Sequence, residues 1–127
     1  CFIEQASKYK IKEIDTFVDG DKTITENLAD QGGVKLGYMA LLNSLKNRNE
    51  ANKWNNYNER QQFWIAYAQS WCSLFTKEAL QEQIKTDYHP PSEFRVNGVM
   101  MNRPEFSKDF QCPKNSAMNP DQKCSLW

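Results

Sequence analysis

The sequence has very few of the residues and motifs from which complete active sites are built. It contains a single histidine, His89, in 127 residues, so a metal site made of several histidines cannot be completed within one chain. The motifs H-E-x-x-H and G-x-S-x-G are missing, and so are the glycine-rich phosphate loop and the calcium-binding loop. We therefore do not expect any enzyme that depends on these motifs to be complete within this chain.

The chain also lacks an excess of charge and a long apolar run. Sixteen basic residues balance sixteen acidic ones, so the sequence predicts neither a nucleic acid nor an anionic membrane surface as a partner. Its longest apolar runs, such as residues 63–68, are far shorter than the roughly 20 residues that cross a bilayer. The first residues show no basic stretch followed by an apolar one. We expect no direct membrane contact from this segment, and any signal or anchor would lie upstream.

The four cysteines form no C-x-x-C pair of the kind that binds structural zinc. We favour disulfides over the alternative, which is a cytosolic protein with four free thiols. The sequence alone permits three pairings of Cys1, Cys72, Cys112 and Cys124. A bridge that tied the two ends of the chain together would contribute about 5 kcal/mol in the loop-entropy model. Cys72 lies in a predicted buried helix with no histidine near it in sequence, so we do not expect a cysteine nucleophile.

Turn and cap signals predict one mainly α-helical domain. Asp19-Gly20-Asp21 is typical of a turn, and a long or broken helix is predicted from Thr23 or Thr25 to about Leu45. Apolar residues wrap most of the surface of a predicted helix at residues 59–75, which indicates burial on more than one side. Further helices are predicted at residues 77–85, at 91–101 and from Pro104, with an exposed connection at 46–58 and an irregular tail from residue 112.

Two carboxylates, Glu26 and Asp30, lie four residues apart and therefore share one helix face. No basic residue follows four positions after either one, so the usual surface ion pair along the helix is missing. The pair is tolerated if solvent screens it or if a cation or a ring N–H group lies against it. Spacing alone favours the solvated surface.

A second polar group surrounds the two prolines that follow residue 89. Asp87 and His89 lie two residues apart in a predicted extended segment, where a carboxylate can fix the tautomer of an imidazole. Arg95 follows six residues later with a guanidinium that can donate forked hydrogen bonds to a carbonyl or a carboxylate. The alternatives are a structural or merely exposed histidine and an ordinary surface salt bridge.

Five sequence blocks carry a resemblance to a known family. They occur in the order TITENLADQGG, QQFWIAYAQSWC, TDYHPPSEFRVNG, NRPEF with the later FQC, and MNPDQKCSLW. Together they resemble the C-terminal portion of the neprilysin family of zinc metallopeptidases, which includes the endothelin-converting enzymes. Thr25 stands where the family usually has glycine, and Pro90 replaces a common serine. The resemblance implies that residues 1–127 form a single disulfide-tied C-terminal segment of a thermolysin-like catalytic domain.

The resemblance also implies roles for the polar residues. Glu26 would be a ligand of one zinc ion, whose two histidine ligands would lie outside this chain. Asp30 would accept a hydrogen bond from a zinc-bound histidine. His89, oriented by Asp87, would stabilise the oxyanion of the tetrahedral intermediate. Arg95 would bind a carbonyl group of the peptide substrate.

Further implied roles concern the pocket and the cysteines. Ser70 and Trp71 match positions that line the pocket for the residue after the cut bond, which favours large apolar side chains. Cys1 and Cys124 match a bridged pair, whereas the counterparts of Cys72 and Cys112 pair with cysteines far upstream.

The resulting hypothesis is a zinc metalloendopeptidase that hydrolyses peptides on the amino side of large apolar residues. Its partners would be peptide substrates and the upstream part of the same polypeptide, and it would be extracellular, either secreted or the ectodomain of a type II membrane protein. The isolated segment is expected to be inactive because the other zinc ligands and the general base are missing from it. The alternative is a non-catalytic extracellular helical binding or antigenic module.

Overall fold

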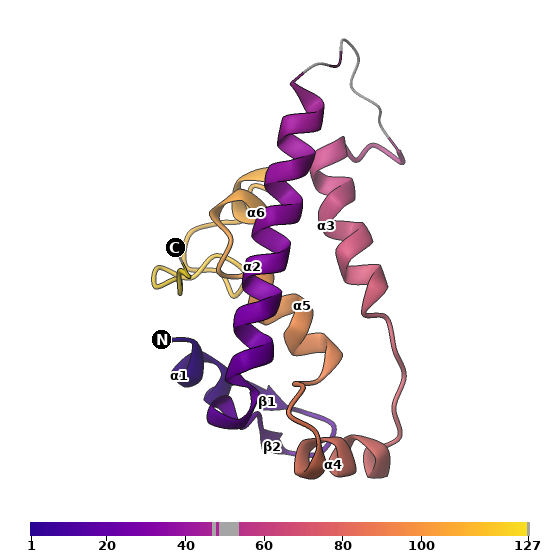
Figure 1. Cartoon of the computed structure of the whole chain (residues 1–127), viewed down its shortest axis with the longest axis vertical. Coiled ribbons are helices and arrows are strands. Elements are labelled where there is room, and N and C mark those ends of the chain that lie inside the picture. Colours follow the sequence, from indigo (N-terminus) through magenta and orange to yellow (C-terminus); the bar gives the residue numbers. More distant parts are fainter. Residues whose placement is uncertain (47, 49–53, 127) are drawn as a thin grey trace.

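The computed structural model describes residues 1–46, 48 and 54–126, and it confirms the mainly α-helical class (Figure 1). A two-stranded antiparallel hairpin pairs Lys10 with Phe17 and Ile11 with Thr16. The sequence did not predict this hairpin or the first helix. The elements are α1 Phe2–Ser7, β1 Lys10–Ile11, β2 Thr16–Phe17, α2 Gly20–Leu45, α3 Glu59–Ser70, α4 Lys77–Thr86, α5 Ser92–Met100 and α6 Pro104–Asp109.

The long helix α2 begins earlier than its predicted start. Asp19, predicted to lie in a turn, is instead the N-cap residue, and its side chain accepts a hydrogen bond of 3.0 Å from the backbone N–H of Lys22. Glycine is required at position 20 because a Cβ there would lie 2.2 Å from the carbonyl oxygen of Ile3 in α1. Thr25 lies inside the helix, so the replacement of glycine at this position does not set the helix start. The helix ends at Leu45, as predicted, and of the two predicted alternatives, long or broken, it is the long unbroken one.

Helix α3 is shorter than predicted because its last turn is closed at Trp71. The backbone N–H of Trp71 donates to Ala68 and that of Cys72 to Gln69, both at 3.1 Å, which are the tight bonds common at a helix end. Cys72 is therefore exposed rather than buried in a helix. Within α3 only Trp64 is buried, so the predicted burial on several sides is not seen in the described chain. In the predicted connection at residues 46–58, positions 47 and 49–53 lie outside the described residues, and the described ones are exposed, as predicted.

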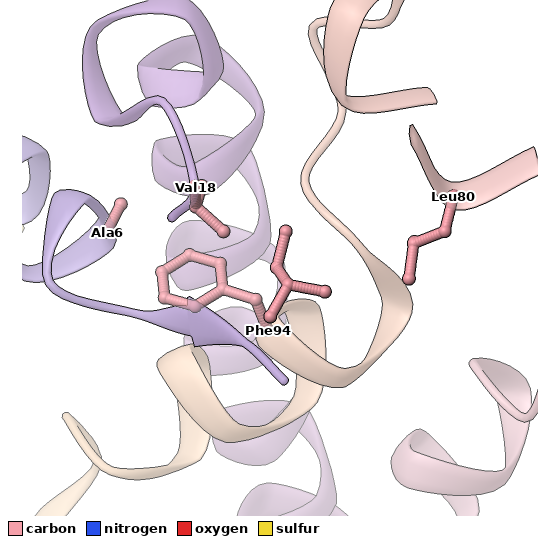
Figure 2. Packing of buried hydrophobic residues seen from close by; sticks show 5 residues of the cluster. Ala6, Val18, Leu80 and Phe94 are labelled. Carbon is pink, nitrogen blue, oxygen red and sulfur yellow. The ribbon is translucent and has the colours of Figure 1, made fainter. Parts of the chain in front are cut away.

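Two apolar clusters hold the elements together. The first joins α1, the hairpin, α4 and α5 through Ala6, Ile11, Val18, Leu80 and Phe94. Figure 2 shows the ring of Phe94 between these elements, with Val18 and Ala6 to one side. The second joins α2, α3 and α5 through Val34, Tyr38, Trp64, Val99 and Met100. Helix α5 contributes to both clusters, so it connects α2 and α3 with α1, the hairpin and α4.

The two ends of the chain meet. Cys1 and Cys124 form a disulfide with a Cα–Cα distance of 5.7 Å, which confirms the predicted pair. Figure 1 shows both termini on the same side of α2. Cys72 and Cys112 are not disulfide-bonded. No helix in the described part of the chain has the length and apolar character needed to cross a membrane.

Candidate functional site

Five polar residues that the sequence analysis singled out lie together in one cluster. Helix α2 contributes Glu26 and Asp30, the segment between α4 and α5 contributes Asp87 and His89, and α5 contributes Arg95. We refer to these five residues as the polar cluster. Its members come from three parts of the chain, and direct contacts between side chains connect them into one chain of interactions.

The junction between α4 and α5 places two of these residues close in space. Asp87 is the C-cap residue of α4, and Pro91 is the N-cap residue of α5. Pro90 is fully buried between them. Because proline interrupts one helix and is tolerated at the start of the next, the chain turns sharply here. His89 and the first turn of α5, which carries Arg95, therefore both face α2.

Arg95 and Asp30 form a forked ion pair. The guanidinium Nε lies 2.7 Å from Asp30 Oδ2, and Nη2 lies 2.6 Å from Oδ1. The two side chains are only 14% and 11% exposed, so this is not an ordinary surface salt bridge. Burial by itself lowers the pKa of Arg95, but the hydrogen bonds and charge of Asp30 outweigh it and leave that pKa raised. Arg95 is thus a fixed cation, and its Nη1 makes no hydrogen bond in the described part of the chain.

Glu26 lies between this cation and the histidine ring. Its Oε2 is 3.1 Å from His89 Nε2 and 3.7 Å from Arg95 Nη2. The Glu26 side chain is 23% exposed. The carboxylate pair on α2 is therefore not the solvated surface that its spacing favoured, because a cation and a ring nitrogen lie against it.

His89 is held from its other side by Asp87. Asp87 Oδ1 lies 2.7 Å from His89 Nδ1 and accepts a second hydrogen bond of 2.9 Å from the His89 backbone N–H. The backbone hydrogen bond, followed by the ring hydrogen bond, lowers the pKa of Asp87. Because a carboxylate can only accept, each ring nitrogen of His89 is a donor here: Nδ1–H faces Asp87 and Nε2–H faces Glu26.

The C-terminal turn of α3 reaches the polar cluster through Trp71. The centroid of its ring lies 3.9 Å from Arg95 Cζ, which is a close face contact between a cation and an aromatic ring. Ser70, in contrast, donates its hydroxyl hydrogen to the carbonyl of Tyr67 at 2.7 Å and is exposed. Only Trp71 of this predicted pair contacts the polar cluster.

Tyr67 was not singled out from the sequence. Its hydroxyl donates to the Arg95 carbonyl at 2.9 Å, and its ring packs edge-on against Trp71. Burial, together with the negative charge of Asp30, raises the pKa of Tyr67, so it stays protonated as a donor at neutral pH. The signal that could have found it is its position four residues before Trp71, which places both on one helix face.

One hollow borders the polar cluster at Asp30, and a second lies beyond Trp71. One, of about 350 Å³, lies between α2 and α3 and is lined by Asp30, Gly33, Gly37, Phe63 and Tyr67 among others. The other, of about 400 Å³, is lined by Trp71 and Cys72 together with residues of the hairpin, α4 and α5. The polar cluster therefore lies beside apolar space on the α2–α3 side, and Trp71 borders apolar space on its far side.

The donors of this chain fit a zinc ion only in part. A catalytic zinc needs about three protein ligands drawn from His, Cys, Asp and Glu. Among the described residues no group of three such side chains is placed to hold a metal ion. Glu26 has a suitable oxygen, but Arg95 beside it is a cation that cannot bind a metal. The described residues therefore hold no complete zinc site, and further ligands would have to come from other residues.

Comparisons with known proteins agree with this picture. The family model described as peptidase family M13 matches residues 1–126. Neprilysin-2 of Drosophila melanogaster is 42% identical over 129 residues, covering 100% of this chain and 17% of that protein. Human endothelin-converting enzyme 1 is 40% identical over 129 residues, covering 100% of this chain and 16% of its own length. The chain thus spans less than a fifth of either relative.

Solved structures show the same arrangement of elements. The zinc metalloprotease Zmp1 of Mycobacterium tuberculosis, in its open state, superposes with a TM-score of 0.91 at 28% identity, over 99% of this chain and 20% of that one. A galactose-containing glycoprotein complex of Haemonchus superposes with a TM-score of 0.90 at 31% identity, over 98% of this chain and 22% of that one.

Proposed function

The chain belongs to peptidase family M13, and on this premise we propose that the protein it is part of is a zinc metalloendopeptidase that cleaves peptides before large apolar residues. The observation that carries the proposal is the polar cluster. A carboxylate, an imidazole with an orienting carboxylate and a fixed guanidinium lie within hydrogen-bonding or ion-pairing distance of one another. These are the groups that a peptidase needs beside its metal ion to bind a peptide and to stabilise developing negative charge.

In this proposal Glu26 supplies one zinc ligand, and the upstream part of the same polypeptide supplies the others. Zinc, when bound, lowers the pKa of its water and so provides a nucleophile at neutral pH. Asp30 would hold a zinc-bound histidine in place while it keeps its fork with Arg95. The two Arg95 hydrogen bonds occupy one lone pair on each Asp30 oxygen, so each oxygen can still accept another donor.

His89 and Arg95 would act on the peptide itself. The Nε2–H of His89 donates to the carbonyl oxygen as that oxygen gains negative charge, and Asp87 keeps the ring in the orientation that this requires. Nη1 of Arg95 donates to a second carbonyl group and so fixes the peptide along the cleft. Both contacts use donors that the chain already holds in place through other bonds.

Substrate preference and location follow from two further features. Trp71, with Ser70 beside it, would line the pocket for the side chain after the cut bond, and a large ring there favours large apolar residues. The Cys1–Cys124 disulfide supports an extracellular location, because such bonds persist in oxidising compartments. The isolated chain is proposed to be inactive, since it contributes one ligand only.

The test is Glu26→Ala in the full-length protein. Bound zinc measured by mass spectrometry and hydrolysis of a peptide with phenylalanine after the cut bond should be lost together. Glu82→Ala, which removes an exposed carboxylate from α4, is the matched control and should retain both. A Glu26→Ala protein that keeps its zinc would overturn the ligand assignment. A wild-type full-length protein that binds no zinc and cleaves no peptide would favour the non-catalytic module.

A further inference from the structure

Besides its looser ion pair with Glu26 at 3.7 Å, Arg95 is restrained at three points, of which one is its ion pair with Asp30. Asp30 holds Nε and Nη2 through the fork. Tyr67 holds the backbone, because its hydroxyl donates to the Arg95 carbonyl at 2.9 Å. The ring of Trp71 covers the guanidinium, with its centroid 3.9 Å from Cζ. The last two restraints both come from the final turns of α3.

The three restraints act on different motions. A forked ion pair keeps a guanidinium and a carboxylate in one plane, but the pair can still rock as a unit on its two flexible side chains. An aromatic ring against the face of the guanidinium opposes that rocking, because any tilt separates the two surfaces. Tyr67 in turn packs edge-on against Trp71, with ring centroids 6.4 Å apart, and so supports the ring.

These restraints determine the direction in which Nη1 of Arg95 can donate. Nε and Nη2 are both occupied, and Nη1 has no hydrogen-bond partner among the residues that the structure describes. Once the plane of the guanidinium is fixed, the direction of the two Nη1 N–H bonds is fixed as well. A donor held in a productive direction before the peptide binds loses less freedom when the contact forms.

We propose that Trp71 is a positioning residue that acts through Arg95: its ring sets the plane of the guanidinium and thereby aims Nη1 at a peptide carbonyl. This inference rests on the proposed function, in which Arg95 binds the substrate backbone, and it adds a role to the lining of the side-chain pocket. The two roles of Trp71 differ in what they predict. Lining the pocket affects the choice of side chain, whereas positioning Arg95 affects every substrate alike.

The experiment is a double-mutant cycle in the full-length enzyme with Trp71→Leu, Arg95→Met and the combined variant. Two peptides are compared, one with phenylalanine and one with alanine after the cut bond. We expect Trp71→Leu to lower kcat/KM by about fivefold to thirtyfold on both peptides, the range of one cation–π contact. In the Arg95→Met background the same substitution should cost less than about twofold, because the residue through which Trp71 acts is gone. Trp71→Phe, which keeps a flat ring, should retain most of the activity.

Three outcomes overturn the inference. They are a full loss from Trp71→Leu in the Arg95→Met background, a loss confined to the phenylalanine peptide, and a Trp71→Phe variant as impaired as Trp71→Leu. Zinc content and the midpoint of thermal unfolding of each variant show whether a loss comes from misfolding. Failure of the proposed function looks different, because it would appear in the wild-type enzyme as absent cleavage or in Arg95→Met as unchanged kinetics.

Discussion

His89 is the residue whose two ring nitrogens connect the polar cluster. Asp87 lies 2.7 Å from Nδ1 and Glu26 lies 3.1 Å from Nε2. Removal of the ring therefore removes the link between Glu26, which is proposed to bind zinc, and Asp87, which is proposed only to orient the ring. We expect His89→Ala in the full-length enzyme to lower kcat by about 10²–10³-fold, the cost of one oxyanion donor. Zinc should stay bound, because His89 is not a ligand in this proposal. Metal analysis beside steady-state kinetics checks both statements, and a metal-free variant would contradict the assignment.

Asp87 should impose a pH dependence on stability. Its pKa in the folded chain is lowered, chiefly by the backbone N–H of His89. A carboxyl group with a lowered pKa stabilises the fold at pH values above its unfolded pKa, which is about 3.9. That stabilisation is lost as the pH falls through the lower folded pKa. Asp87→Asn should therefore lower the thermal midpoint at pH 6, and the difference from wild type should disappear in strong acid.

Thermal unfolding followed by circular dichroism from pH 6 down to pH 2 measures this difference. Asp121→Asn, which removes an exposed carboxylate from the C-terminal tail, is the matched control and should keep a thermal midpoint close to that of wild type. A difference between Asp87→Asn and wild type that stayed constant across the whole range would show that the ionised carboxylate is not the source of the effect.

Single residues of the polar cluster were predictable from the sequence, but their partners were not. The spacing of Glu26 and Asp30 places both on one helix face, and the short spacing of Asp87 and His89 fixes a local contact. Nothing local indicates that Arg95 pairs with Asp30, because 65 positions separate them and only the packing of α5 on α2 brings them together. The solvated surface was therefore the wrong choice from spacing, because Arg95 and His89 lie against the two carboxylates.

Some helix boundaries were predictable from the sequence and others were not. The end of α2 and the positions of α4 and α5 were predicted to within a residue or two, because an Asn-rich, charged stretch follows α2 and two prolines separate α4 from α5. The start of α2 was missed because the Asp-Gly-Asp sequence that favours a turn also suits an N-cap. The end of α3 was missed because the apolar pattern continues through Leu74 and Phe75, although both are exposed in the described chain at 99% and 47%.

The N-cap of α2 offers a test at the scale of one element. Asp19 accepts a hydrogen bond from Lys22 at the start of a helix that carries Glu26 and Asp30. Asp19→Ala should lower the free energy of unfolding by about 1 kcal/mol, whereas Asp19→Asn, which can still cap, should cost only a few tenths. Urea unfolding of both variants measures the two values. Equal losses would contradict capping and would point to the charge instead.

At the scale of the whole molecule, a disulfide connects the two ends of the chain. The sequence allowed three cysteine pairings, and the resemblance, not the sequence pattern, indicated that Cys1 pairs with Cys124. The structure shows in addition a buried, hydrogen-bonded residue beside that bridge. Asn102, which is 3% exposed, exchanges two hydrogen bonds with Gln5, at 2.9 and 2.6 Å. Its Oδ1 also accepts from the Cys124 backbone N–H at 2.9 Å. The first helix, the tail and α5 therefore meet at one buried amide.

Asn102 and the disulfide should consequently stabilise the molecule together rather than independently. Asn102→Ala leaves the Cys124 N–H without its partner and removes one of the two side-chain donors to the Gly98 carbonyl, the other being Gln31. We expect it to cost about 2 kcal/mol in urea unfolding. In a chain with both Cys1→Ser and Cys124→Ser the tail is no longer tied down, so water can reach these groups. The same Asn102 substitution should then cost less than half as much, a coupling that a double-mutant cycle measures directly. Full additivity would show that the amide and the bridge stabilise separate parts of the fold.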